Sequence, residues 1–81
     1  MNYFIRGAIE KAAKNQCLVE ITYTDSKGAV STRMVEPYEF KNDALYAFCT
    51  IKNGMRCFKT NKISRASATN VKFTPRWEIL I

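Results

Sequence analysis

The sequence of 81 residues predicts a mainly β fold, a small β-barrel capped by one N-terminal α-helix. Three observations lead to this prediction. Apolar residues recur with a helical period only at the start of the chain, later segments alternate apolar and polar residues, and tight-turn sequences separate those segments. A chain of this length forms one domain with one modest core, and closing its sheet removes exposed strand edges. We therefore expect a single domain over residues 1–81, with barrel strands over about 17–81.

Residues 2–15, NYFIRGAIEKAAKN, are predicted to form the helix. Its apolar stripe, which is expected to face the core, consists of Phe4, Ile5, Ala8, Ile9 and Ala12. The segment lacks the apolar stretch and small-residue cleavage site of a signal peptide, and the chain has no apolar run long enough to span a bilayer. These features lead us to expect a cytoplasmic protein without a membrane partner.

The next part of the chain is predicted to form a hairpin. CLVEITYT (17–24) alternates as a half-buried strand does, and DSKG (25–28) has the Asp and Gly that a type I turn prefers. AVSTRMVEP (29–37) is the returning arm, which is expected to end at Pro37 because proline lacks the N–H that a sheet ladder needs. A separate short strand at 38–40 and a turn at 41–43 follow.

The most apolar segment, ALYAFCTI (44–51), is expected to be the central strand. KNG (52–54) contains Asn-Gly, a strong hairpin signal, so MRCFK (55–59) is the returning arm. The remaining predictions are a single turn at TNKIS (60–64) and one or two strands within 65–81, where WEILI packs its apolar residues on the body. Trp77 is expected to clamp the last strand.

The net charge of +6 is concentrated in the second half of the chain. Residues 1–43 carry equal numbers of acids and bases, whereas residues 44–81 carry seven Lys and Arg residues against Glu78 alone. Within MRCFKTNKISR, bases stand at every third position, at Arg56, Lys59, Lys62 and Arg65. Such a one-sided field attracts polyanions or anionic ligands. The alternative is a solvated face that keeps a small protein soluble.

Catalytic and metal-site patterns are missing from the sequence. The chain has no histidine, which excludes Ser-His-Asp and Cys-His chemistry, and no glycine-rich phosphate loop. The three cysteines lack metal-ligand spacing and are expected to be reduced thiols. Glu36 is a lone carboxylate, which we expect to bind Arg33 or the nearby turn. The sequence therefore predicts a non-enzymatic protein without a metal or cofactor.

Several short motifs resemble the WYL domain family. In chain order they are AIE, EITYTDSKGAVSTRMVEP, LYAFC and RCFKTNKI, which together span roughly residues 8–65. The positions that match the family pattern are Tyr23, Gly28, Arg33, Glu36, Pro37, Arg56, Phe58, Lys59, Lys62 and Ile63. Leu45, Tyr46 and Ala47 stand where the family has its Trp-Tyr-Leu triplet, so only the tyrosine is retained. The resemblance implies a Sm-like, SH3-type barrel.

The departures from the pattern resemble a divergent branch in which four basic residues and a cysteine line a groove. In this chain the resemblance assigns those roles to Arg33, Arg56, Lys59, Lys62 and Cys49. Tyr46 and Tyr38 are candidates to stack on a nucleic-acid base if they are exposed. Tyr23 and Phe58 are expected to pack in the core instead.

The resemblance also implies a function. WYL domains are regulatory or ligand-sensing modules of bacteria and phages, so we expect a module that binds a nucleotide, single-stranded DNA or RNA. A stand-alone copy resembles a phage or mobile-element accessory protein acting in the host cytoplasm. Two alternatives stay open: a module that docks on an acidic host protein, and a sponge for a nucleotide second messenger. Sm-like barrels commonly associate, so a homo-oligomer is expected.

Overall fold

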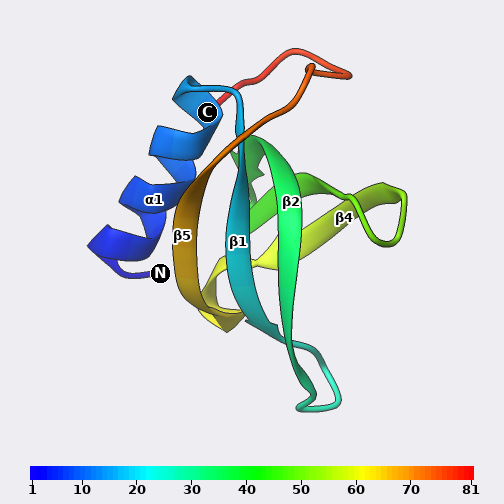
Figure 1. The fold of residues 1–81 in the computed structure, drawn as a ribbon. Coiled ribbons are helices and arrows are strands. Elements are labelled where there is room, and N and C mark those ends of the chain that lie inside the picture. Colours follow the sequence, from blue (N-terminus) through cyan, green and yellow to red (C-terminus); the bar gives the residue numbers. More distant parts are fainter.

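The computed structural model describes all 81 residues and contains one α-helix and five strands (Figure 1). The elements are α1 (Tyr3–Lys14), β1 (Cys17–Thr24), β2 (Val30–Lys41), β3 (Ala44–Cys49), β4 (Gly54–Lys59), the 3₁₀ helix η1 (Thr60–Lys62) and β5 (Ile63–Lys72). The predicted mainly β fold with an N-terminal helix is confirmed. No helix is both long enough and apolar enough to cross a bilayer.

The strands form one antiparallel sheet in the order β4-β3-β2-β1-β5. The central strand is β2, so the prediction that 44–51 is central was wrong. β3 is apolar on both faces because the core covers one face and the C-terminal segment covers the other. Side chains from all five strands and α1 meet in one core, and η1 links β4 to β5. No ladder pairs β4 with β5, so the predicted closure of the barrel is not detected.

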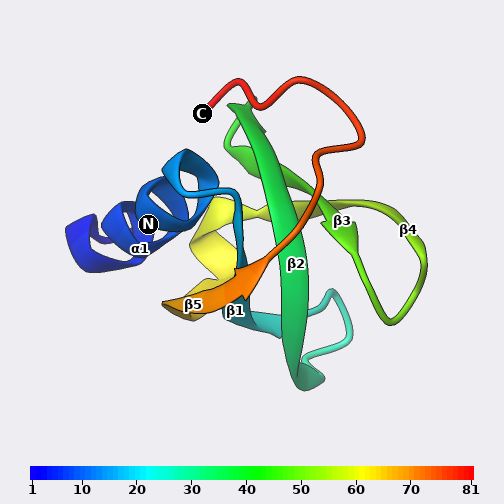
Figure 2. The same cartoon turned by 45° about the horizontal axis from the view of Figure 1, so that its top comes forward.

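The two faces of the sheet have different surroundings. The inner face carries the core, which includes Val19, Ile21, Val35, Leu45, Ala47 and Phe58. Helix α1 packs against this face with Ile5, Ile9 and Ala12, and it lies beside β5 and β1 (Figures 1 and 2). The outer face is the opposite one. Since side chains alternate along a strand, the register assigns every strand residue to one face or the other.

Helix α1 begins after Asn2, whose Oδ1 accepts a hydrogen bond from the Ile5 N–H at 2.8 Å. The helix ends at Asn15, as predicted. Phe4 was predicted to face the core but is 84% exposed. It lies about 100° around the helix from Ile5, outside the buried stripe.

Strand β2 continues through Pro37, so the prediction that the strand ends there was wrong. Pro37 pairs with Ala47 and Glu39 pairs with Tyr46, which leaves Tyr38 as an extra residue on β2. This is a β-bulge, where proline's missing N–H is tolerated. The Tyr38 hydroxyl donates to the Glu36 carboxylate two residues earlier, at 2.6 Å.

Turns fall near their predicted positions. Gly28, at the end of the first hairpin turn, has a φ of 83°, and its N–H donates to the Asp25 carbonyl at 3.0 Å. Asn42 and Asp43 both have positive φ, as a type I′ hairpin turn requires. The turn predicted at 52–54 spans 50–53, and β4 begins at Gly54.

Residues 73–81 form no strand, contrary to the prediction of strands up to residue 81. This C-terminal segment returns across the outer face of β2 and β3 (Figure 2). The Leu80 N–H donates to the Tyr38 carbonyl at 2.7 Å, and the Trp77 ring packs on Tyr38 and Phe48. Ile81 reaches the core. The predicted packing of WEILI on the body holds only in part, because Trp77 and Leu80 are 52% and 57% exposed. Trp77 clamps this segment rather than a strand.

Candidate functional site

Three of the predicted site residues share the inner face of the sheet. Cys49 on β3 pairs with Val35 on β2 and with Gly54 on β4. Arg33 lies two residues before Val35, and Arg56 lies two residues after Gly54, so both point to the same face as Cys49. The register therefore places an arginine diagonally on each side of the Cys49 thiol.

Arg33 and Cys49 are in contact. The Arg33 Nη1 atom lies 4.0 Å from Cys49 Sγ, and Arg33 Nε donates to Ser31 Oγ at 3.2 Å. Arg33 is half-buried and Cys49 is fully buried. Beside them is a cavity of ≈180 Å³, which we call the Arg33 recess, lined by Ser31, Thr32, Arg33, Cys49, Ile51 and Lys52. The serine hydroxyl therefore orients the guanidinium.

The surroundings of Cys49 favour negative charge. Burial opposes the thiolate, but the backbone N–H groups of Lys52 and Ile51 and the Arg33 guanidinium together lower the pKa of Cys49 below its ordinary value. The Arg33 Nη1 atom, at 4.0 Å, is the side-chain donor in contact with the sulfur. Two basic residues, Arg33 and Lys52, line the Arg33 recess.

The two arginines are well separated along the sheet. Counted by register, Arg33 and Arg56 are four positions apart along the strands and two strands apart across them. Their Cα atoms are therefore roughly 13 Å apart in one direction and roughly 10 Å apart in the other, before the curvature of the sheet is considered. A ligand that contacts both guanidinium groups must extend across β3 or carry more than one anionic group.

The other predicted basic residues lie beyond this face. Lys59 alternates onto the opposite face from Arg56, and Lys62 is exposed on η1. The structure contains two ion pairs, Arg6–Glu10 and Arg76–Glu36. None of the four predicted site bases is therefore neutralised by a carboxylate.

Tyr46 lies on the outer face, where it pairs with Cys57. A hydrogen bond with the Cys57 thiol raises the pKa of Tyr46. The structure does not bring Tyr46 together with Arg33, Cys49 and Arg56. Tyr38 is buried, which removes it as a stacking candidate.

Two aromatic predictions about the core hold. Phe58 is 2% exposed, and the Tyr23 ring meets it edge-on with centroids 5.0 Å apart. The Tyr23 hydroxyl accepts a hydrogen bond from the Lys59 N–H at 3.3 Å. Both residues therefore belong to the packing of the core.

The prediction that Glu36 binds Arg33 or the turn was wrong. Glu36 is on the outer face and Arg33 is on the inner face, because the two residues are three positions apart on one strand. The Glu36 carboxylate accepts hydrogen bonds from the Tyr38 hydroxyl at 2.6 Å and from Arg76 Nε at 3.1 Å. Its role is to hold the C-terminal segment.

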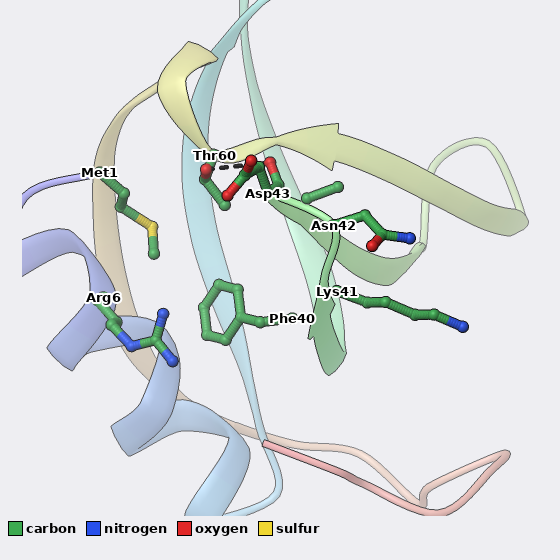
Figure 3. Close-up of a pocket in the computed structure, with 8 residues that line it drawn as sticks. Met1, Arg6, Phe40, Lys41, Asn42, Asp43 and Thr60 are labelled. Carbon is green, nitrogen blue, oxygen red and sulfur yellow. Dashed lines mark hydrogen bonds between the residues drawn. The ribbon is translucent and has the colours of Figure 1, made fainter.

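A second cavity, of ≈330 Å³, lies between α1 and the β2–β3 turn (Figure 3). The Arg6 guanidinium sits 4.4 Å above the Phe40 ring centre and pairs with Glu10. At its other end, the Thr60 N–H and hydroxyl both donate to the Asp43 carbonyl, at 2.9 Å and 3.0 Å. These contacts fasten η1 to the turn. Of the two basic side chains that line this cavity, Arg6 is already paired and Lys41 is not.

Sequence reasoning missed four residues of the Arg33 recess, which are Ser31, Thr32, Ile51 and Lys52. Ser31 carried a signal, since it is two positions before Arg33 on a predicted strand and therefore shares its face. Lys52 was assigned only to a turn, and its position beside Cys49 depends on how that turn folds back. The three cysteines are free, with Cys17 and Cys49 buried and Cys57 exposed.

Comparisons with known proteins identify the family of the chain. The family model of the WYL domain matches residues 5–68. The chain is 33% identical over 63 residues to an uncharacterized HTH-type transcriptional regulator, YobV, of Bacillus subtilis (strain 168), a match that covers 73% of this chain and 20% of the regulator.

A solved structure shares the fold. Proteasome accessory factor B/C (PafBC) of Arthrobacter aurescens superposes with a TM-score of 0.72 at 21% identity, over 83% of this chain and 11% of that protein. The chain thus spans a small part of both relatives. Both are bacterial proteins, and neither supports the expected phage or mobile-element origin. The family match over most of the chain shows that this protein belongs to the WYL domain family.

Proposed function

We propose that the chain is a non-enzymatic regulatory module that binds an anionic ligand, a nucleotide or a short single-stranded nucleic acid. The proposed site comprises Arg33, Cys49 and Arg56 on the inner face, and Lys59 and Lys62 add positive charge from outside that face. The observation that carries the proposal is the shared face of the two arginines, neither of which has a carboxylate partner. Membership of the WYL family and the likeness to a transcriptional regulator support a regulatory role.

The chemistry of the site suits phosphate. A guanidinium binds two phosphate oxygens at once, and lysines add point charge. Arg33 is held by Ser31 and lies beside a recess that Lys52 also lines. Because Tyr46 lies on the outer face, affinity in this proposal comes from phosphate contacts rather than from base stacking on that ring.

Ligand titrations test the proposal. Fluorescence anisotropy with labelled oligonucleotides, and calorimetry with mononucleotides and dinucleotides, should detect binding at low salt. Arg56→Ala should cost about 1.5–3 kcal/mol of binding free energy, the usual loss of a charge-assisted contact. Lys41→Ala is the matched control, because Lys41 is an exposed cation on β2 without a side-chain hydrogen bond in the structure. It should change affinity far less.

Salt dependence separates the ligand classes. A single strand held through several phosphates should show log K falling with log salt by about 0.7 per contact. A mononucleotide should show a shallow dependence and a preference for one base. If neither class binds at low salt, and Arg56→Ala alters nothing, the anion-site proposal is wrong. A module that docks on an acidic protein would then be the leading function.

A further inference from the structure

We propose that the outer face carries a docking site for the start of helix α1 of a second copy of this chain. The site is a cavity of ≈460 Å³, here called the outer recess, lined by Tyr38, Glu39, Tyr46, Met55, Trp77, Glu78 and Leu80. It lies on the opposite side of the sheet from Arg33 and Cys49. The proposal therefore goes beyond ligand binding and does not depend on it.

The lining of the outer recess is apolar and open to solvent. Met55, Trp77 and Leu80 are 42%, 52% and 57% exposed, so three large apolar side chains meet water around one hollow. An apolar cavity of about 150 Å³ holds a benzene ring, so the recess has room for an aromatic side chain. Exposed apolar surface grouped in this way is typical of an interaction site.

The rim of the outer recess is acidic, although the chain as a whole is basic. Glu39 and Glu78 both line it, and Glu78 is the only acid after Asp43. Neither carboxylate takes part in an ion pair. An apolar group that lies beside positive charge would therefore complement the outer recess.

The start of α1 has these properties. Tyr3 and Phe4 are 86% and 84% exposed, and their rings meet edge-on with centroids 6.0 Å apart. No acid stands in the first helical turn, so the positive end of the helix dipole beside these rings is not neutralised locally. The chain therefore exposes both an aromatic pair with positive potential and an acid-rimmed apolar hollow.

The contact must join two molecules. Helix α1 packs against the inner face and contacts mainly β5 and β1, whereas the outer recess lies over β2, β3 and β4. The sheet separates the two surfaces within one chain (Figure 1). Because the surfaces are different, the contact is head-to-tail and produces a closed ring or an open chain of subunits.

A mixing experiment tests this arrangement. Phe4→Ser removes the helix surface and keeps the recess, while Met55→Lys alters the recess and keeps the helix surface. Sedimentation velocity and native mass spectrometry should show concentration-dependent association of the unaltered chain. Each variant alone should associate at least about tenfold more weakly, as expected for a central apolar contact. An equimolar mixture of the two should form a one-to-one pair, because each supplies the surface that the other lacks.

Val30→Ser is the control, since Val30 is 66% exposed outside both surfaces. It should leave association unchanged, and circular dichroism should show that all variants fold. The proposal is overturned if the unaltered chain stays monomeric, if Val30→Ser weakens association equally, or if the mixture gives no pair. Association that persists in both variants, or a recess that binds only a different protein, also overturns it.

Discussion

The Nε atom of Arg76 binds the Glu36 carboxylate at 3.1 Å, and the two residues are 40 positions apart in the sequence. Glu36 is 4% exposed, so this carboxylate has little contact with water. The Arg76 guanidinium also lies 3.9 Å above the Phe48 ring centre. One arginine therefore neutralises a buried charge and covers an apolar ring, and it attaches the C-terminal segment to β2 and β3.

Arg76→Ala should destabilise the fold by roughly 1–3 kcal/mol, because it leaves a buried carboxylate without its charged partner. Urea unfolding followed by Trp77 fluorescence measures this change. Glu10→Ala is the matched control, since it breaks the other ion pair, in which both side chains are about half exposed. That variant should change the unfolding free energy by less than about 1 kcal/mol. Equal effects in the two variants would contradict the role given to Glu36.

The Tyr38 hydroxyl should make stability depend on alkaline pH. Burial raises the pKa of Tyr38 from 10.0 to about 12, and the neighbouring Glu36 carboxylate adds to the shift. The folded state thus favours the neutral phenol. The contribution of the Tyr38 hydroxyl to the free energy of unfolding is fully present below pH 10 and is lost as the pH rises through 12.

Unfolding measured between these pH values should show the loss. Ultraviolet absorbance should show two tyrosines titrating late, Tyr38 and Tyr46, because the pKa of Tyr46 is raised as well. Tyr38→Phe should remove one of these two late titrations and cost roughly 1.5–3 kcal/mol at neutral pH, the usual loss of a hydrogen bond to a charged group. If Tyr38→Phe leaves both late titrations in place, the assignment is wrong.

Local patterns predicted most elements of this fold. The alternation in 17–24, the Asn15 helix stop and the 3₁₀ turn after β4 all depend on neighbouring residues, and each lies where the pattern indicated. The strand break at Pro37 failed because a bulge absorbs the missing donor. The bulged residue, Tyr38, is held by the C-terminal segment through the Arg76 N–H and the Trp77 ring, which are long-range contacts.

The arrangement of the candidate site around Arg33 and Cys49 was predictable only in part. Period-2 alternation is enough to place Ser31 and Arg33 on one face, and Lys59 on the face opposite Arg56. Bringing Arg33 beside Cys49 required the pairing of Val35 with Cys49, which no local pattern specifies. Alternation also places Glu36 on the face opposite Arg33, but no local pattern specifies its partner Arg76, which is 40 positions away.

Replacing either of two glycines by alanine should change the stability of the fold, in opposite directions. A methyl group added at Gly7 or Gly28 would meet no atom within 4 Å. Gly7 lies within α1, so Gly7→Ala should stabilise the fold by about 0.5–1 kcal/mol. Gly28 has a φ of 83°, which strains an L residue, so Gly28→Ala should destabilise by roughly 1 kcal/mol. Thermal unfolding of both variants measures the difference, and changes of the same sign would contradict the turn geometry.

The Cys49 thiol should report on the Arg33 recess. The Arg33 guanidinium helps to lower the pKa of Cys49, so Arg33→Ala should raise that pKa. Lys52 acts on the sulfur through its backbone N–H, so Lys52→Ala should leave the pKa of Cys49 nearly unchanged. Thiolate absorbance, titrated in a chain with Cys17→Ala and Cys57→Ser, isolates this one group.

Arg33→Ala and Lys52→Ala should both weaken binding of an anionic ligand, because both remove positive charge from the Arg33 recess. A bound nucleotide or oligonucleotide should in turn raise the pKa of Cys49, since its phosphates oppose a second negative charge nearby. If a saturating anionic ligand leaves the thiol titration unmoved, that ligand does not occupy the Arg33 recess.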